Sequence, residues 1–282
     1  MNKPIASVAR TREILKTYDL RARKGYGQNF LVDVSVVARC AEAAHCEQAV
    51  IEIGPGIGAL TEQLALRSQH VRAYEVDERL LPVLADTLQD YKNVEIILQD
   101  FLTCDIAASV QELKAQYGAV SVAANLPYYI TTPVLFSLFE KGQEIEWITV
   151  MVQKEVADRF AAPVNSPDYG TLSVESQYLY EVERLFNVPR TAFNPAPKVD
   201  SAIVRFHRRP ETPEGEELTA YFDLVKACFK QRRKTIYNNL KEYLQDAERT
   251  ETVLRQAGID PGQRAQECPP EQFAVLLKEI RG

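Results

Sequence analysis

The fold of this 282-residue chain is decided by a stretch in which an apolar run meets closely spaced glycines: Ala49-Val50-Ile51-Glu52-Ile53-Gly54-Pro55-Gly56-Ile57-Gly58-Ala59-Leu60-Thr61. The apolar start predicts a strand, and the residues after Gly58 predict a helix. Between them, Gly54 and Gly56 let the backbone approach a ligand at the carboxyl end of the strand. The spacing is G-x-G-x-G and not the G-x-G-x-x-G of dinucleotide sites, so the stretch alone also fits a plain tight turn.

An acidic residue ends the next predicted strand. Residues 70–74 are followed by Glu75, about 20 residues beyond the glycines, where a carboxylate can accept both hydroxyls of a ribose. Asp77 is better placed to cap a helix predicted at residues 78–90. The pair of strands therefore indicates a nucleoside site at one edge of a parallel sheet.

A third predicted strand, residues 94–99, ends in Asp100 and Phe101. The carboxylate can accept a hydrogen bond from an adenine amine, and the aromatic ring can shield the base. An Asp at a strand end is also an ordinary turn residue. Its position in line with Glu75 favours the ligand interpretation.

The fourth strand end carries Asn125-Leu126-Pro127-Tyr128, after an apolar run at residues 119–124. It offers an amide, a free backbone carbonyl and an aromatic face, which together suit a flat amine. Because the carboxyl ends of parallel strands share one edge of a sheet, polar groups at four successive strand ends predict a single crevice.

Composition limits the remaining possibilities. A 46% hydrophobic chain can bury a sizeable core, and the five scattered cysteines indicate neither a disulfide framework nor a metal site. The net charge is −6, so any binding of nucleic acid must come from local basic patches, at the start of the chain and at residues 226–241. No apolar run suggests a membrane span or secretory signal, and we expect a cytoplasmic monomer. The basic start also resembles a transit peptide, although Glu13 and Asp19 weaken that alternative.

Motifs along nearly the whole chain resemble those of the ribosomal RNA adenine dimethyltransferases, and most of all the bacterial small-subunit branch of that family. The matching stretches are Gly27-Gln28-Asn29-Phe30-Leu31, Glu52-Ile53-Gly54-Pro55-Gly56, Glu75, Asp100, Asn125-Leu126-Pro127-Tyr128, Gln153-Lys154-Glu155-Val156-Ala157-Asp158-Arg159, Tyr169-Gly170-Thr171-Leu172-Ser173, Phe193-Asn194-Pro195-Ala196-Pro197-Lys198-Val199-Asp200-Ser201 and Gln231-Arg232-Arg233-Lys234-Thr235-Ile236.

The resemblance implies a class I S-adenosylmethionine-dependent methyltransferase, with an α/β, Rossmann-like seven-stranded sheet whose last strand pair is antiparallel. Strand-like runs at residues 145–153, 183–188 and 201–207 agree with it. We expect a methyltransferase domain at residues 1–209 that includes the basic start. A charged, proline-containing linker follows at 210–217, and a small all-α domain that binds RNA or the ribosome at 218–282.

The resemblance also assigns the cofactor side of the crevice. Asn29 and Leu31 would line the S-adenosylmethionine pocket, Gly54 would approach the methionine part, and Asn125 would touch both cofactor and target base. The complete expected cofactor set is Gln28, Asn29, Leu31, Gly54, Gly56, Glu75, Asp100, Phe101 and Asn125, and no metal is expected.

The activity implied is dimethylation of the N6 amines of two adjacent adenosines near the 3′ end of 16S rRNA, within the small ribosomal subunit or its precursor. The amine nitrogen is a poor nucleophile because its lone pair is delocalised into the ring. If the Asn125 oxygen and the Leu126 carbonyl accept its hydrogens, the lone pair can face the donor methyl group. Pro127 would stiffen the turn and Tyr128 would stack on the base. Phe193 is a second stacking candidate, or a core residue of a stiff loop.

Basic residues in the segment 228–240 alternate with apolar ones at helical spacing, which predicts a basic helix. We expect Arg232, Arg233 and Lys234 to contact RNA, and Lys198 either to meet a phosphate or to lie in solvent.

Three other functions fit parts of the pattern. One is the antibiotic-resistance branch of the fold, which methylates an adenine of 23S rRNA, although its members are generally strongly basic. Another is a non-catalytic RNA-binding factor of ribosome assembly. A nucleotide-dependent dehydrogenase is the third, and the glycine spacing argues against it.

Overall fold

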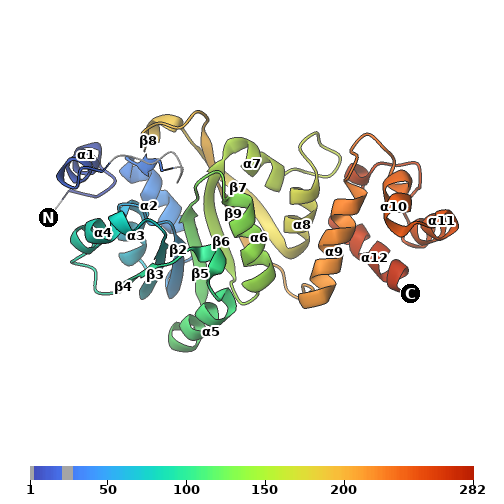
Figure 1. Ribbon diagram of the computed structural model, residues 1–282, viewed down its shortest axis with the longest axis horizontal. Coiled ribbons are helices and arrows are strands. Elements are labelled where there is room, and N and C mark those ends of the chain that lie inside the picture. The colour runs from blue at the N-terminus through green and yellow to red at the C-terminus, as the bar shows by residue number, and fades with distance from the viewer. Residues whose placement is uncertain (1–2, 21–27) are drawn as a thin grey trace. The chain divides into compact units, whose positions relative to one another are not determined.

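The computed structural model describes residues 3–20 and 28–282 and contains a seven-stranded sheet (Figure 1). The strand order is β4-β3-β2-β5-β6-β9-β7. The neighbouring pairs from β4 to β6 are parallel, and β9 runs antiparallel to β6. The bounds are β2 Ala49–Ile53, β3 His70–Glu75, β4 Val94–Leu98, β5 Val120–Asn125, β6 Trp147–Gln153, β7 Tyr180–Val188 and β9 Ser201–Arg208. The predicted α/β fold class is confirmed.

The glycine-containing stretch lies at the middle of the sheet. Its strand β2 pairs with β3 on one side and with β5 on the other, and all five β2 residues are buried. A central parallel strand is covered on both faces, which is why its sequence is nearly continuously apolar. Glu52 is the exception in this strand.

Helices and 3-10 turns connect these strands. Asp33 caps α2 by accepting hydrogen bonds from the amides of Ser35 and Val36. Asp77 caps η2 by accepting a hydrogen bond from the amide of Arg79, which confirms the predicted role of Asp77 as a cap. The helical elements up to the end of β9 are α1 Val8–Thr17, α2 Val34–Ala43, α3 Ala59–Ala65, η2 Glu78–Leu80, α4 Leu81–Thr87, η3 Phe101–Thr103, α5 Ile106–Tyr117, α6 Thr131–Lys141, α7 Lys154–Phe160, α8 Thr171–Leu179 and η4 Arg190–Ala192.

The chain divides into two compact units. The first comprises residues 1–157 and 183–208, and the second comprises 158–182 and 209–282. Residues 158–182, which we expected in the first domain, cluster with the second unit. The reason is packing, because α8 lies against the C-terminal helices α9, Gly215–Cys228, and α12, Pro270–Arg281. Figure 1 shows α8 beside α9. The division into domains expected from the sequence stays a prediction.

The second unit is helical after residue 209. Its later elements are α9 Gly215–Cys228, α10 Ile236–Leu244, α11 Ala247–Gln256, η5 Ala265–Glu267 and α12 Pro270–Arg281. Helix α9 begins at Gly215, inside the segment expected to be a linker. Among the described residues, no helix has the length and apolar character needed to span a membrane.

The predicted basic helix across residues 228–240 is wrong. Helix α9 ends at Cys228 and α10 begins at Ile236, so the basic residues occupy a turn. The side chain of Asn239, 2% exposed, donates to the carbonyls of Cys228 and Gln231 and accepts from the Gln231 amide. The buried side-chain amide of Asn239, from the following helix, thus supplies hydrogen-bond partners for the backbone of the turn. The helical periodicity of the sequence cannot indicate such a contact.

Candidate functional site

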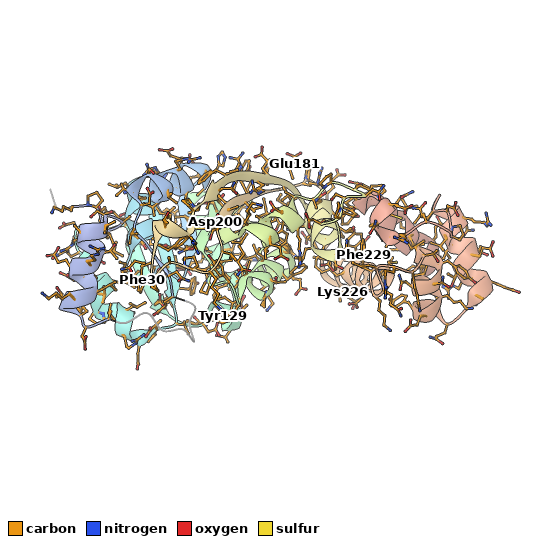
Figure 2. The ribbon with its side chains drawn as sticks, turned by 90° about the horizontal axis from the view of Figure 1, so that it is seen from above. Phe30, Tyr129, Glu181, Asp200, Lys226 and Phe229 are labelled. Carbon is orange, nitrogen blue, oxygen red and sulfur yellow. The ribbon has the colours of Figure 1, made fainter. Side chains whose placement is uncertain are left out.

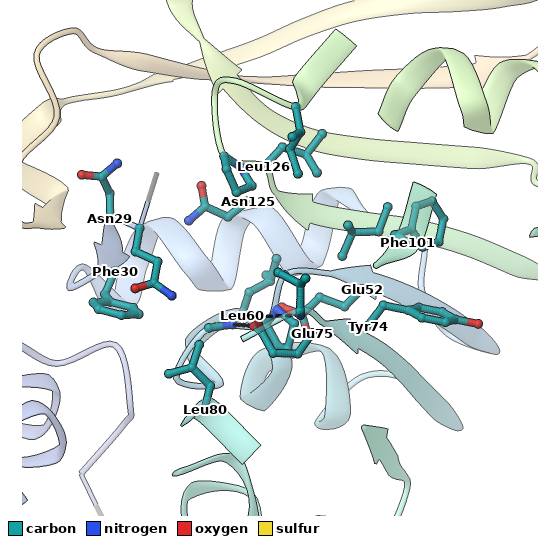
Figure 3. Close-up of a pocket in the computed structure, with 18 of the residues that line it drawn as sticks. Asn29, Phe30, Glu52, Leu60, Tyr74, Glu75, Leu80, Phe101, Asn125 and Leu126 are labelled. Carbon is teal, nitrogen blue, oxygen red and sulfur yellow. Dashed lines mark hydrogen bonds between the residues drawn. The ribbon is translucent and has the colours of Figure 1, made fainter. Parts of the chain in front are cut away.

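The carboxyl ends of the strands in the first unit enclose one pocket (Figure 3). It spans about 1080 Å³ when the open solvent at its mouth is included. Phe30 and Phe101 lie at opposite sides in Figure 3, with Glu52 and Glu75 between them. Every predicted catalytic or cofactor residue lines this pocket: Gln28, Asn29, Leu31, Gly54, Gly56, Glu75, Asp100, Phe101, Asn125, Leu126, Pro127, Tyr128 and Phe193. Gly27 of the first motif lies outside the described residues, as do Arg21, Arg23 and Lys24 of the basic start.

The glycine turn takes a conformation that other residues rarely adopt. Gly54 has φ +72° and Gly56 has φ +61°. A Cβ atom built on Gly54 would meet no atom within 4 Å, whereas one on Gly56 would lie 3.5 Å from the Phe30 ring. Gly54 therefore leaves open space in the pocket where any larger residue would intrude.

Glu75 is held rigidly at the end of β3. One carboxylate oxygen accepts hydrogen bonds from the backbone amides of Val76 and Asp77, and the other accepts one from the amide of Gly56 at 3.2 Å. Burial raises the pKa of Glu75, and these backbone hydrogen bonds act in the opposite direction. The side chain is an acceptor fixed beside the glycine turn.

Asp77 connects the first motif to the same strand end. It forms an ion pair with Arg79, which lowers the pKa of the Asp77 carboxyl, and it accepts a hydrogen bond from the Gln28 amide at 2.9 Å. Gln28 is thereby held at the wall of the pocket. The sequence identified the cap but not this second contact.

Asp100 and Phe101 occupy the third strand end. One Asp100 oxygen accepts the amide of Leu102 at 3.0 Å as the cap of η3. The residue is nonetheless exposed and lines the pocket. Phe101 is buried, with its ring edge-on to Tyr74 at a centroid distance of 5.3 Å. The turn interpretation and the ligand interpretation of Asp100 are thus compatible, since only one of its oxygens is used by the cap.

The Asn125-Leu126-Pro127-Tyr128 motif follows β5 directly. Within the described part of the chain, neither the Asn125 side chain nor the Leu126 carbonyl takes part in a hydrogen bond. The Pro127 carbonyl, in contrast, accepts from the amide of Ile130 and the hydroxyl of Thr131. The hydrogen bonds that close the turn therefore end on the Pro127 carbonyl. The Asn125 side-chain oxygen and the Leu126 carbonyl remain as available acceptors at the pocket.

A two-stranded ribbon joins two distant parts of the pocket wall. Strand β1, Phe30–Leu31, pairs antiparallel with β8, Phe193–Asn194, and Leu31 lies opposite Phe193. Phe193 is 5% exposed and belongs to the hydrophobic core, yet it also lines the pocket. Phe193 is therefore both a core residue and a residue of the pocket wall, as each of its two predicted roles requires.

Glu52 is a pocket residue to which the sequence analysis gave no role. Its side chain is 1% exposed, and its Oε2 atom has no hydrogen-bond partner among the described residues. Burial raises the pKa of Glu52 to about 8, and the charge of Glu75 adds to this effect. A lone acidic residue within an apolar strand was the signal available in the sequence.

Replacing Glu52 with glutamine, Glu52→Gln, is expected to give a stability gain over the wild type that grows with pH. Glu52 ionises near 4.5 in the unfolded chain and near 8 in the folded protein, so the wild type loses stability as pH rises between these values. The difference should increase by about 1.4 kcal/mol for each pH unit in that window and level off above it. Urea unfolding at several pH values measures it, and a difference independent of pH contradicts the assignment.

The basic turn contains residues of two kinds. Arg232 donates to the backbone carbonyls of Pro167 and Tyr169, at 2.8 and 2.9 Å, so it also holds a loop of its own unit. Arg233 and Lys234 are exposed. Lys198 is exposed in the first unit, on the loop between β8 and β9.

A reversed strand at one side of a parallel sheet, a glycine turn after the central strand and acidic residues at the next strand ends agree with the Rossmann-like methyltransferase fold that the motifs imply. Residues 19–281 match the model of one family, described as ribosomal RNA adenine dimethylase. The chain belongs to the ribosomal RNA adenine dimethylase family. It is an enzyme that methylates adenine in ribosomal RNA, and the family membership expected from the motifs is confirmed.

Individual relatives agree with this placement. The chain is 45% identical to "Ribosomal RNA small subunit methyltransferase A" of Bacillus licheniformis, over 100% of this chain and 99% of that protein. Among solved structures, the 23S rRNA methyltransferase ErmE is 33% identical with a TM-score of 0.67, covering 90% of this chain and 100% of that one. A dimethyladenosine transferase from Plasmodium falciparum has a TM-score of 0.75 at 24% identity over 89% of this chain and 97% of that one, which supports the fold.

Proposed function

We propose that this protein uses S-adenosylmethionine to dimethylate the N6 amines of two adjacent adenosines near the 3′ end of small-subunit ribosomal RNA. The observation that carries the choice of subunit is the 45% identity, along the full length, to a protein named for the small subunit. The identity to the 23S rRNA methyltransferase is 33% over 90% of the chain.

The pocket fits a nucleoside cofactor with a methionine part. The open space beside Gly54 admits an extended chain close to the backbone, and the fixed Glu75 carboxylate can accept ribose hydroxyls. Asp100 would accept a hydrogen bond from the adenine amine of the cofactor, and Phe101 would cover the base. The remaining wall would be formed by Gln28, Asn29 and Leu31. When bound, S-adenosylmethionine supplies an electrophilic methyl group on a sulfonium.

Asn125 and Leu126 provide the acceptors for the target amine. Their two oxygens are available at the same strand end, and each would accept one hydrogen of the amine. Holding both hydrogens favours a tetrahedral nitrogen whose lone pair is free to react. A neutral amide suits this position because a full negative charge would bind a cationic cofactor too strongly before reaction.

Tyr128 and Phe193 would cover the faces of the flipped base. A base removed from an RNA stack loses its neighbours, and each aromatic contact restores about 1–3 kcal/mol. Both residues line the pocket, Tyr128 as a half-buried ring and Phe193 as a buried one, so Tyr128 offers the larger face to a base.

We further propose that the second unit, with Lys198 of the first, contacts the RNA backbone. The protein as a whole is acidic, so attraction to phosphate must be local. Arg233 and Lys234 meet this requirement as exposed cations at a turn, and Arg232 adds charge while it holds its loop.

Removing two charges from the basic turn, Arg233→Ala with Lys234→Ala, is expected to weaken RNA binding and make it less sensitive to salt. For every phosphate that is no longer neutralised, the log–log salt slope should fall by about 0.7–0.9. Filter binding of small-subunit RNA over a salt series measures the slope. The control, Arg255→Ala with Lys278→Ala, removes the same charge from α11 and α12 of the same unit. Equal slopes for the two variants contradict the proposal.

The choice of subunit is tested by methyl transfer from labelled S-adenosylmethionine to small-subunit and large-subunit particles, each isolated from cells that lack the modification. Label is expected in the small-subunit RNA only. Label confined to the 23S RNA would assign the protein to the other branch of the fold. Binding of RNA without transfer to either would indicate a non-catalytic assembly factor.

A further inference from the structure

The corner at which β9 begins is linked to the amine-holding turn by one side-chain hydrogen bond. The Ser201 hydroxyl lies 2.8 Å from the Tyr128 hydroxyl, and the two residues are 73 positions apart in the chain. Ser201 is 0% exposed, and Tyr128 is half-buried in the wall of the pocket. The contact therefore joins a buried group to a residue that faces the site.

Ser201 is part of a well-fixed backbone. It lies opposite Gln153 in the antiparallel ladder between β6 and β9. The preceding residue, Asp200, which is labelled in Figure 2, accepts two hydrogen bonds. Its backbone carbonyl accepts one from the Lys154 amide at 3.0 Å, and its side chain accepts one from the Arg190 amide at 2.8 Å. The serine hydroxyl is thus presented from a corner that is tied at three points.

The Tyr128 hydroxyl has no evident part in methyl transfer to an amine. A phenylalanine ring would offer the same stacking face, so the hydroxyl must serve another purpose if it contributes at all. A tyrosine hydroxyl is protonated at neutral pH, and burial raises the pKa of Tyr128 further above its ordinary value of 10.0. A neutral phenol bonded to a fixed partner is suited to hold its ring at one angle.

We propose that Ser201 is a positioning residue, which through its hydrogen bond to Tyr128 holds that ring in the orientation that stacks on the target adenine. The inference rests on the proposed function, and it deepens it by extending the base site to a residue outside the pocket lining. Ser201 would act through Tyr128 alone and would not contribute to the cofactor side.

The test compares Ser201→Ala, Tyr128→Phe and the double variant, each as the full-length protein, in steady-state methylation of small-subunit particles. Each single change removes one hydrogen bond and is expected to lower kcat/KM for the RNA by about 3- to 10-fold. The double variant should equal the single ones, because both changes remove the same contact. The dissociation constant for S-adenosylmethionine should stay at the wild-type value in all three.

A second readout reports the base directly. A short RNA with 2-aminopurine at the target position should lose fluorescence when the base stacks on Tyr128, and Ser201→Ala should weaken this quenching. The control is Ser68→Ala, because the Ser68 hydroxyl also makes a single side-chain hydrogen bond, to the Leu64 carbonyl at 2.7 Å, in the same unit but with neither residue in the pocket wall. It should leave both kcat/KM and quenching unchanged.

Several results would overturn the inference while the proposed function stands. These are multiplicative losses in the double variant, a weaker affinity for the cofactor, or wild-type quenching in Ser201→Ala, with the wild-type enzyme active throughout. A wild-type protein that transfers no methyl group to any ribosomal RNA would instead remove the proposed function itself.

Discussion

The variant Asn125→Ala is expected to lower kcat for methyl transfer by about 10²- to 10³-fold, the usual loss when one positioned polar contact to a reacting group is removed. Asn125 ends β5, and its side-chain amide makes no hydrogen bond with the described residues, so alanine should leave the fold intact. Single-turnover methylation at saturating RNA and cofactor measures the effect.

The companion variant Asn125→Asp separates acceptance of a hydrogen bond from charge. It keeps acceptor oxygens but adds a negative charge, so it should bind the cationic cofactor at least as tightly as the wild type while kcat stays low. If Asn125→Ala retained kcat and only raised the KM for RNA, Asn125 would be a binding residue and the mechanism would lose its central group.

The variant Gly54→Ala is expected to weaken binding of S-adenosylmethionine by about 10- to 100-fold, because overpacking a tight site by one methyl group costs about 1–3 kcal/mol and each 1.4 kcal/mol is tenfold in affinity. Its Cβ would point into open pocket space, from a backbone with φ +72°. Isothermal titration calorimetry with the purified protein gives the dissociation constant.

Gly258 offers a matched control for backbone strain. It has φ +70°, and a Cβ built there also meets no atom within 4 Å, but it follows α11 in the second unit. Gly258→Ala should lose a similar amount of stability, about 1–2 kcal/mol for a left-handed residue, and keep wild-type affinity for the cofactor. Equal affinities for the two variants would show that the space beside Gly54 is not used by the cofactor.

The sheet could be predicted from the sequence because its signals are local. Each of its first strands is a short run rich in apolar residues, and the residues that bring chemistry directly follow these runs. Glu75, Asp100 and Asn125 could therefore be placed together from the order of residues alone, since parallel strands end at one edge. Membership of the family followed from the motifs for the same reason.

Features that depend on distant partners could not be predicted. The turn at residues 229–235 replaces a helix because a buried Asn239 side chain satisfies its backbone. Arg232 looked like its two basic neighbours, yet it donates to carbonyls about 65 positions away. Residues 158–182 joined the helical unit through the packing of α8, which no composition change in the chain announces.

We infer that the turn containing Asn125 presents an adenine amine of small-subunit RNA for two successive methyl transfers. Mass spectrometry can detect the product in under-methylated small subunits that have been incubated with the purified protein and S-adenosylmethionine. We expect N6,N6-dimethyladenosine at two adjacent positions near the 3′ end of the RNA with the wild-type protein, and none with Asn125→Ala at the same protein concentration and time. Absence of dimethyladenosine with the wild-type protein, or equal amounts with both proteins, would contradict this inference.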